Sequence, residues 1–502
     1  MEFTDRDLEQ LRQLGIPLDE VRRQIEILRN PPPFVRVDRP CRTGDGIRVI
    51  PESDRGALLA AWEEAAAEGR LTKFVPASGA ASRMFRSLSA IAGEDPVPDR
   101  AALASRSREG DGNARDTLTF LENLDRFAFR SELEKVLDQE LRNASPAAVL
   151  SALLSEKGLA YGRRPKGLIP FHEYPEGPRT PAAEQLAEAT GCVRDRQGGC
   201  RVHFTVSEEH LDLFRRHVDE TAAHRIEFST QDPSTDTIAV TPKNEPFRCE
   251  DGAILFRPGG HGALIRNLEA LSGDIVLIKN IDNVVPDRHR APTLEWKRIL
   301  TGLATTLQWR IHDYQARLEN GELVNEAFEF LRTELSLVTP PEIEASEPAR
   351  IRVFLEDRLN RPLRVCGVVI NEGEPGGGPF WVRDASGIPT CQIVESSQID
   401  LDEPAQKKAF DRATHFNPVD LVCAMRDWRG RPYDLERFID PQTVSVAEKS
   451  HGGRPLKALE RPGLWNGAMA HWNTVFVEVP AETFTPVKTV LDLLRPVHSG
   501  QQ

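Results

Sequence analysis

Several separated segments of this chain place a charged side chain beside small or restricted residues. The first, Lys73–Arg86 (KFVPASGAASRMFR), runs from a β-like stretch into a small-residue turn that is followed by Arg83. Small residues let a backbone approach a ligand closely, and free N–H groups at a helix start favour phosphate. The segment predicts a nucleotide-binding loop with Arg83 as a phosphate ligand. An ordinary tight β–α connection is the alternative, because such turns are common. The small residues are Ala77, Ser78, Gly79, Ala80 and Ala81.

The second candidate phosphate ligand is a lysine in a turn that proline stiffens. Lys166 stands between Pro165 and Gly167 in RRPKGLIP, just ahead of an apolar stretch. Its ammonium could therefore be held at a fixed point near a phosphate. The alternative is a solvated loop lysine.

A glycine-rich turn, RPGGHG at 257–262, follows a β-like run and precedes a helical pattern. Its N–H groups could approach a ligand closely. The alternative is a plain strand–helix turn. Its glycines are Gly259, Gly260 and Gly262.

Asp282 is the candidate metal ligand. It lies in the segment KNIDNVVPD, which directly follows the apolar run 275–278. Ligands in open α/β sheets sit beyond the carboxyl ends of the strands. Magnesium needs only one or two protein carboxylates, because water and phosphate oxygens complete its shell. A capping role for this Asp is the weaker alternative. His172 and His261 lack zinc-ligand spacing and are interpreted as hydrogen-bonding groups.

The elements that must position these residues alternate between strand and helix. β-like runs at Arg201–Val206 and Ile275–Ile281 are separated by helical patterns such as Gly262–Leu271, which is typical of a mostly parallel sheet with crossover helices. Two short amphipathic helices are predicted over residues 4–30, the first capped by Thr4. From Arg364 onward β-like runs dominate.

Composition and charge narrow the class of protein. The 502 residues are 39% hydrophobic and 28% charged, as in soluble globular proteins. No apolar run approaches the ~20 residues that cross a bilayer, and the start MEFTDRDLEQ lacks the features of a signal peptide. We therefore predict a cytoplasmic protein without a membrane partner. The net charge of −13 disfavours nucleic acid as a partner.

Taken in order, the segments resemble the UDP-sugar pyrophosphorylases of the nucleotide-diphospho-sugar transferase superfamily. That family has a glycine-rich loop ending in Arg, a Pro-Lys segment, a P-G-x-G stretch, a strand ending in Asp-Asn and a late F-x-P-x-K. The shared order carries the resemblance, since each piece alone is weak. The counterparts here are Ser78–Arg83, Pro165–Lys166, Pro258–Gly262, Asp282–Asn283 and Phe484–Lys488.

Two further pieces extend the resemblance into the second half of the chain. Phe380–Gln398 is similar to the family's hairpin ending in V-E-Y-S-E, and His415–Asn417 to its F-N sugar-contacting element. In amino-acid sequence, the segments KFVPASGAASRMF and IKNIDNVVPD are most similar to a bacterial family described only as a domain of unknown function (4301).

The resemblance implies a Rossmann-like, GT-A-like α/β fold with a mixed, mostly parallel sheet, an N-terminal helical extension and a helical insertion. It also implies a Mg²⁺-dependent reaction. An oxygen of a sugar 1-phosphate attacks the α-phosphorus of a nucleoside triphosphate, expected to be UTP, and pyrophosphate leaves. The implied parts are a helical extension at 1–69, a nucleotide-binding part at 70–340 with an insertion at about 93–160, and a sugar-binding part at 341–502.

The same resemblance implies a role for each candidate residue. Arg83 and its loop would hold the triphosphate, Lys166 would neutralise charge at the α-phosphate, and Lys488 would contact the sugar phosphate. Asp282 would carry magnesium. The residues implied to bind the nucleoside are Gly259, Gly260, Gly262 and Gln231, and those implied to bind sugar hydroxyls are Glu395 and Asn417.

Departures from the family pattern keep other functions open. The first loop has Ala80 and Ala81 where glycines are usual, and Ser396 and Gln398 replace the family's tyrosine and second glutamate. A glycosyltransferase that uses an NDP-sugar donor is one alternative. A noncatalytic nucleotide-sugar-binding protein is the other, since fold analogy cannot separate the three.

Overall fold

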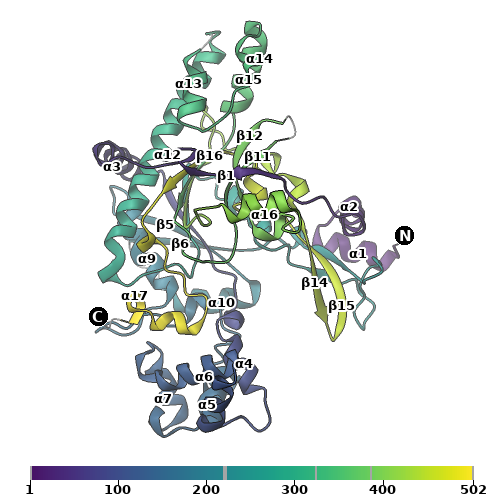
Figure 1. The fold of residues 1–502 in the computed structure, drawn as a ribbon, viewed down its shortest axis with the longest axis vertical. Coiled ribbons are helices and arrows are strands. Elements are labelled where there is room, and N and C mark those ends of the chain that lie inside the picture. The colour runs from purple at the N-terminus through teal and green to yellow at the C-terminus, as the bar shows by residue number, and fades with distance from the viewer. Residues whose placement is uncertain (1–2, 219–222, 323–324, 385–386, 500–502) are drawn as a thin grey trace. The chain divides into compact units, whose positions relative to one another are not determined.

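The computed structural model describes residues 3–218, 223–322, 325–384 and 387–499 (Figure 1). Its largest sheet has nine strands in the order β2-β3-β16-β10-β13-β9-β4-β5-β6. Strand β13 runs antiparallel to β10 and β9, whereas the pairs β2–β3, β3–β16, β16–β10, β4–β5 and β5–β6 are parallel. The predicted mixed, mostly parallel sheet is thereby confirmed. The strands are β2 (Arg42–Thr43), β3 (Gly46–Arg48), β4 (Leu71–Pro76), β5 (Cys200–Val206), β6 (His224–Thr230), β9 (Ile275–Ile278), β10 (Leu363–Val368), β13 (Asp420–Ala424) and β16 (Asn473–Glu478).

The chain forms two compact units, each assembled from three separate stretches. The first unit comprises Met1–Thr72, Gln231–Ile278 and Arg298–Pro480. The second unit comprises Lys73–Thr230, Lys279–Lys297 and Ala481–Gln502.

The second unit has a mainly helical core beside its strands. The helices in the region of the predicted insertion pack around buried aromatic residues, with the rings of Phe127 and Phe129 5.1 Å apart. Val487 and Val490 from near the C-terminus join this cluster. Asp99, Asp111 and Ser145 cap three of the helices through side-chain oxygens, as expected for helix starts. The helices are α4 (Arg86–Ala92), α5 (Arg100–Arg108), α6 (Gly112–Glu122), α7 (Arg130–Leu137), α8 (Pro146–Leu154), α9 (Pro181–Cys192), α10 (Leu211–His217) and α17 (Pro496–Ser499).

The first unit begins with the two predicted helices, α1 (Asp5–Leu14) and α2 (Leu18–Arg29). Thr4 caps α1, and Gly15 ends it with a left-handed φ of 70°, which favours glycine. Their apolar faces pack on β7 (Thr237–Val240). This strand belongs to a four-stranded sheet, β14-β15-β7-β8, and a three-stranded sheet has the order β1-β11-β12. The further strands are β1 (Val37–Pro40), β8 (Phe256–Arg257), β11 (Gly378–Arg383), β12 (Pro389–Val394), β14 (Ser445–His451) and β15 (Arg454–Glu460).

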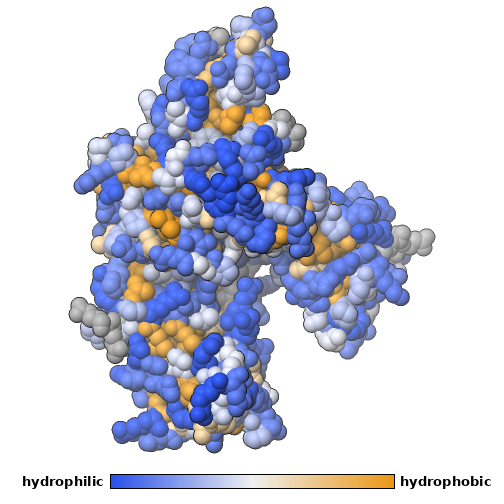
Figure 2. All heavy atoms as spheres, in the orientation of Figure 1, coloured by the Kyte–Doolittle hydropathy of each residue, from blue (hydrophilic) through white to orange (hydrophobic). Residues whose placement is uncertain are grey.

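One helix, α12 (Arg290–Glu319), is 30 residues long and was not anticipated from the sequence. Among the described residues, no helix is both long and apolar enough to cross a membrane. On the face shown in Figure 2, hydrophilic side chains predominate and apolar ones lie in small groups. The remaining helices are α3 (Glu52–Ala67), α11 (Leu264–Ala270), α13 (Glu326–Thr333), α14 (Pro341–Glu344), α15 (Pro348–Leu359) and α16 (Pro404–Asp411).

Candidate functional site

The predicted phosphate loop follows β4 and is open to solvent. Ala77 is buried, and its N–H donates to the carbonyl of Thr205 at 2.8 Å. Ser78, Gly79, Ala80 and Arg83 are exposed. No described atom lies within 4 Å of the position that a Cβ on Gly79 would take. The loop leads into a short 3-10 turn, Ala81–Arg83, and not directly into a helix.

Backbone hydrogen bonds join this loop to the Pro-Lys segment. The N–H of Ala81 donates to Arg164 O at 3.0 Å, and the N–H of Lys166 donates to Gly79 O at 3.1 Å. Ala80 and Pro165 form a β-bridge between these two bonds. The loop and Lys166 therefore form one local structure, although they lie far apart in sequence.

Lys166 reaches the third predicted segment through its side chain. Its Nζ lies 2.7 Å from Oδ2 of Asp282, and the two side chains are 13% and 24% exposed. Gly167 allows this approach, because a Cβ there would lie 3.0 Å from side-chain atoms of Ile281 and Phe214. The predicted phosphate ligand and the predicted metal ligand are thus direct neighbours.

The C-terminal segment that carries Lys488 meets the same place. The N–H of Val487 donates to the carbonyl oxygen of Asp282 at 3.1 Å, and the N–H of Thr485 donates to Oδ1 of Asn283 at 3.0 Å. Lys488 is exposed, with its Nζ 6.0 Å from the centroid of the Phe484 ring. The second unit therefore contains Arg83, Lys166, Asp282 and Lys488. Hydrogen bonds and one ion pair join the loop, Lys166, Asp282 and the segment just before Lys488.

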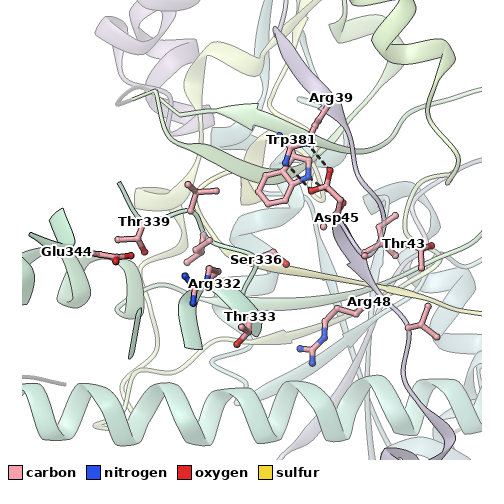
Figure 3. A pocket seen from close by; sticks show the side chains of 16 residues that line it. Arg39, Thr43, Asp45, Arg48, Arg332, Thr333, Ser336, Thr339, Glu344 and Trp381 are labelled. Atoms are coloured by element: carbon pink, nitrogen blue, oxygen red, sulfur yellow. Dashed lines mark hydrogen bonds and ion pairs between the residues drawn. The ribbon is translucent and has the colours of Figure 1, made fainter. Parts of the chain in front are cut away.

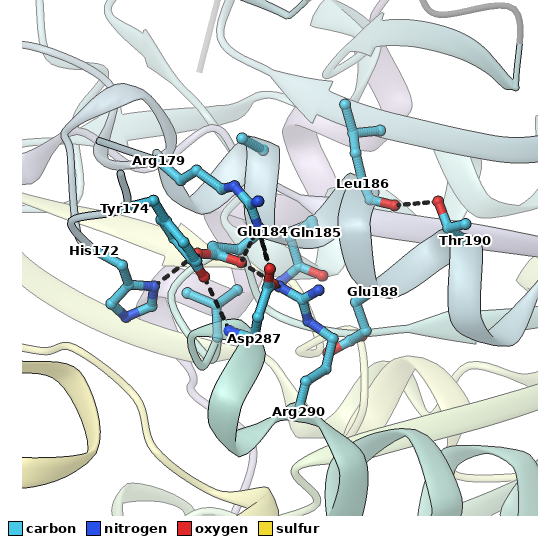
Figure 4. Close-up of polar contacts among 12 residues, drawn as sticks. His172, Tyr174, Arg179, Glu184, Gln185, Leu186, Glu188, Thr190, Asp287 and Arg290 are labelled. Carbon is cyan, nitrogen blue, oxygen red and sulfur yellow. Dashed lines mark hydrogen bonds and ion pairs between the residues drawn. The ribbon is translucent and has the colours of Figure 1, made fainter. Parts of the chain in front are cut away.

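A buried polar network stabilises the turn that follows Asp282 (Figure 4). Glu184, 1% exposed, accepts from Tyr174 Oη at 2.8 Å, lies 2.9 Å from Nδ1 of His172 and forms an ion pair with Arg290. Tyr174 Oη in turn accepts from the N–H of Asp287 at 2.9 Å. Burial raises the pKa of Tyr174. His172 hydrogen-bonds, as expected, and Glu184 was missed by sequence reasoning.

Behind the site, Glu188 is buried among lysine side chains. Its carboxylate lies 2.8 Å from Nζ of both Lys73 and Lys279, and 3.2 Å from Nζ of Lys297. Burial alone would raise the pKa of Glu188, but the three ammonium groups hold it well below its usual value. Burial also lowers the pKa of Lys73 to about 8. The sequence offered one signal of this network: Lys73 lies inside an apolar strand, and Lys279 directly follows another.

The glycine-rich turn at 257–262 lies in the first unit and has a structural explanation. Gly260 has a φ of +76°, a region that favours glycine. A Cβ on Gly259 would lie 2.7 Å from Thr235 O, and one on Gly262 would lie 2.1 Å from Pro462 O. Close backbone contacts and the positive φ are therefore sufficient reasons for glycine at these positions. Gln231 donates to Oδ1 of Asp236 at 3.2 Å.

The two predicted sugar contacts are hydrogen-bonded to each other in the first unit. Nδ2 of Asn417 donates to Oε1 of Glu395 at 2.8 Å. Oδ1 of Asn417 is buried and has no hydrogen-bond partner among the described residues. Gln398 accepts from the N–H of Glu395 at 3.0 Å and from Asn466 at 2.9 Å. This cluster offers amide and carboxylate groups suited to sugar hydroxyls.

The metal prediction rests on a single carboxylate. Within the described part of the chain, no group of three or more His, Cys, Asp or Glu side chains could hold a metal ion. Asp282 is partly exposed and uses Oδ2 for Lys166. Such a donor suits Mg²⁺, which takes most of its ligands from water and phosphate, and does not suit zinc.

Comparisons with known proteins place the chain in a family. A family model described as a domain of unknown function, DUF4301, matches residues 4–499. A structure of the UDP-N-acetylglucosamine pyrophosphorylase from Trypanosoma brucei is 13% identical, with 95% of this chain and 74% of that chain covered and a TM-score of 0.47. A mutant UDP-glucose pyrophosphorylase from Leishmania major, solved with UDP-glucose, is 12% identical, with 97% and 77% covered and a TM-score of 0.44. No curated protein matches in sequence.

Proposed function

The chain belongs to the DUF4301 family, and we propose that it is a nucleotidyltransferase that joins a nucleoside triphosphate to a sugar 1-phosphate, giving an NDP-sugar and pyrophosphate. One observation carries this proposal. The exposed loop at 77–83, Lys166, Asp282 and the segment of Lys488 are hydrogen-bonded or ion-paired into one site of the second unit. Cations beside an open, small-residue loop are suited to polyphosphate.

The chemistry needs positioning and charge neutralisation more than a reactive side chain. A phosphate oxygen of the sugar 1-phosphate is already ionised, so no general base is required for its attack on the α-phosphorus. Arg83 would hold the triphosphate over the loop. Lys166 would turn from Asp282 toward the α-phosphate and stabilise the charge that develops there. Lys488 would hold the phosphate of the sugar.

Asp282 would hold a magnesium ion. When bound, this ion would neutralise phosphate charge and orient the two substrates. The carboxylate would then exchange its pairing with the Lys166 ammonium for the metal.

The nucleoside and sugar assignments complete the proposal. Gly259, Gly260, Gly262 and Gln231 are proposed to lie along the nucleoside, with UTP as the expected triphosphate. Glu395 and Asn417 are proposed to bind sugar hydroxyls, and the buried Oδ1 of Asn417 supports this role. We expect the protein to act in the cytoplasm.

A noncatalytic nucleotide-sugar-binding function is the second candidate. Gln398, which stands where the family pattern has a glutamate, hydrogen-bonds to Glu395, Asn466 and the carbonyl of Thr443. The departures from the family pattern in this cluster are what favours binding without turnover. The glycosyltransferase alternative has no comparable observation in its favour.

Product formation tests the proposal directly. Each of the four common nucleoside triphosphates would be incubated with the protein, Mg²⁺, inorganic pyrophosphatase and a panel of sugar 1-phosphates, and products would be identified by mass spectrometry. An NDP-sugar is expected, most strongly with UTP. UDP-sugar binding without any product would favour the noncatalytic function, and release of free UDP from a UDP-sugar with an acceptor would favour the glycosyltransferase.

A further inference from the structure

A pocket of about 810 Å³ in the first unit contains none of the residues proposed to bind nucleotide, sugar or metal. Three parts of the chain form most of its lining (Figure 3): residues 43–49 around β2 and β3, residues 332–339, which begin at the end of α13, and Trp381 of β11. Its volume falls within the range of small-molecule sites.

Guanidinium and hydroxyl groups make up most of its polar lining. The carboxylates in the lining are those of Asp45 and Glu344. Asp45 is already bound by Arg39 through two hydrogen bonds of 2.8 and 3.0 Å. The other polar lining side chains are Thr43, Arg48, Arg332, Thr333, Ser336 and Thr339.

Arg48 and Arg332 are incompletely neutralised. One carboxylate, Glu334, pairs with both Arg48 at 3.0 Å and Arg310 at 3.3 Å, so these three groups carry one surplus positive charge. Arg332 pairs with Glu329 of its own helix, but the two side chains are 67% and 58% exposed. Such a solvated pair is weak, and an anion could readily replace it.

Two lining residues of the segment 332–339 are in energetically unfavourable states, one in its backbone and one in its side chain. Ser336 has a φ of +53°, a region that residues other than glycine seldom adopt. The hydroxyl of Thr339 is buried and lacks a hydrogen-bond partner among the described residues. Strained backbone and unsatisfied polar groups concentrate at binding sites.

We propose that this pocket binds a small phosphorylated molecule, with its phosphate held by Arg48, Arg332 and the hydroxyls of Thr333 and Ser336. Guanidinium forks match phosphate oxygens bidentately, and the Ser336 hydroxyl supplies a further donor. The Thr333 hydroxyl donates to the Glu329 carbonyl at 2.8 Å and would exchange that bond for one to the phosphate. In Figure 3 these four side chains lie on one side of the pocket, with Trp381 and Arg39 on the other. The remaining volume accommodates the organic part. This inference does not depend on the proposed reaction.

A fluorine probe at Trp381 tests the site without any activity. The protein would be labelled with 5-fluorotryptophan and the Trp381 resonance assigned by its loss in Trp381→Phe. Inorganic phosphate and, separately, succinate would be titrated at constant ionic strength. A saturable shift of the Trp381 resonance with phosphate, and a weaker response to succinate, is expected. No saturable shift, or equal binding of succinate, would overturn the proposal.

Matched arginine variants locate the binding. Arg332→Gln and Arg48→Gln should each weaken phosphate binding on the order of tenfold, because each removes a charge-assisted contact. Arg48→Gln should still fold, since Glu334 retains Arg310. Arg215→Gln removes an arginine that is 58% exposed, similar to Arg332 at 67%, and should bind phosphate as the unaltered protein does. So should Arg83→Gln, which alters the proposed nucleotide loop. Unchanged affinity in both pocket variants would refute the site.

Discussion

The ammonium of Lys166 lies 2.7 Å from a carboxylate oxygen of Asp282, so the two groups neutralise each other when no substrate is bound. Both side chains are partly exposed, at 13% and 24%. Phosphate would attract Lys166 and magnesium would attract Asp282. Under the proposed function, each charge of the pair would therefore have a new partner in the substrate complex.

Asp282→Asn should make triphosphate binding independent of magnesium. The substitution frees Lys166 from its ion pair, so UTP without metal should bind at least as tightly as it does to the unaltered protein. The additional affinity that Mg²⁺ confers should disappear, because the amide is a poorer magnesium ligand. Calorimetric titration with UTP, without and with Mg²⁺, measures the affinity for UTP alone and the additional affinity that Mg²⁺ confers. A magnesium-dependent increase that persists in this variant would place the metal elsewhere.

Turnover should depend strongly on both members of the pair. Asp282→Asn and Lys166→Ala should each lower the rate of NDP-sugar formation on the order of 100-fold or more, as expected for groups that stabilise transition-state charge. Arg163→Ala is the control, because this neighbouring arginine is 77% exposed and pairs with Glu156. Near-normal rates in both Asp282 and Lys166 variants would contradict the assigned roles.

Two glycine substitutions compare an open position in the phosphate loop with a closely packed position. Gly79→Ala should leave the free energy of unfolding within about 0.5 kcal/mol, because no described atom lies within 4 Å of the new Cβ, but it should weaken UTP binding. Gly262→Ala should destabilise by roughly 1–3 kcal/mol, since its Cβ would lie 2.1 Å from the Pro462 oxygen. Urea unfolding and UTP titration of both variants provide the comparison. Normal UTP affinity in Gly79→Ala would argue for a plain turn.

The family resemblance grouped segments that lie in both units, and those of Arg83, Lys166, Asp282 and Lys488 all belong to the second unit. The resemblance joined Arg83, Lys166, Asp282 and Lys488 into one site, and strand ends in a parallel sheet explain why they can be neighbours. The direct pairing of Lys166 with Asp282 was not predictable, because it depends on side-chain directions. The Glu188 network was also missed, since its lysine partners come from segments distant in sequence. The Glu184 network was missed too, although His172 and Tyr174 are nearby in sequence, because a carboxylate on a helix gives no sign that it is buried.

The glycine-rich turn shows that one motif can have two explanations. The turn at 257–262 was noticed for its possible access to phosphate, whereas Gly259 and Gly262 are explained by close contact with the Thr235 and Pro462 backbones. Sequence pattern cannot separate these causes, because both require a missing side chain. The length of α12 was likewise unexpected, since tertiary packing overrides local propensity.

Glu188→Gln should be strongly destabilising. The substitution leaves the ammonium groups of Lys73, Lys279 and Lys297 around a neutral amide in a buried site, and uncompensated buried charge costs about 3–5 kcal/mol. Glu140→Gln is the control, because the Glu140 pair with Arg142 is 61% and 80% exposed and should be worth at most about 1 kcal/mol. Equal unfolding midpoints for the two variants would contradict this account.

His498 should make the protein sensitive to acid. Its Nδ1 lies 2.9 Å from Nε2 of His172. Burial, and then the charges of His172, Arg495 and Arg288, lower its pKa from 6.5 to about 3. The unfolded chain therefore binds a proton that the folded chain excludes, so stability present above pH 6.5 is lost as the pH falls toward 3. The loss approaches about 1.4 kcal/mol per pH unit.

Substitution at His498 tests this linkage. His498→Gln keeps a hydrogen-bonding group but removes the titration, so its free energy of unfolding should fall less than that of the unaltered protein between pH 7.5 and 5. The difference should be about 2 kcal/mol at most, from the slope above. His217→Gln, at an exposed position, should follow the unaltered protein. Hydrogen exchange should report opening at low pH first near residues 481–499, because His498 lies in that segment. Parallel pH profiles for His498→Gln and the unaltered protein would show that this histidine pair does not set acid stability.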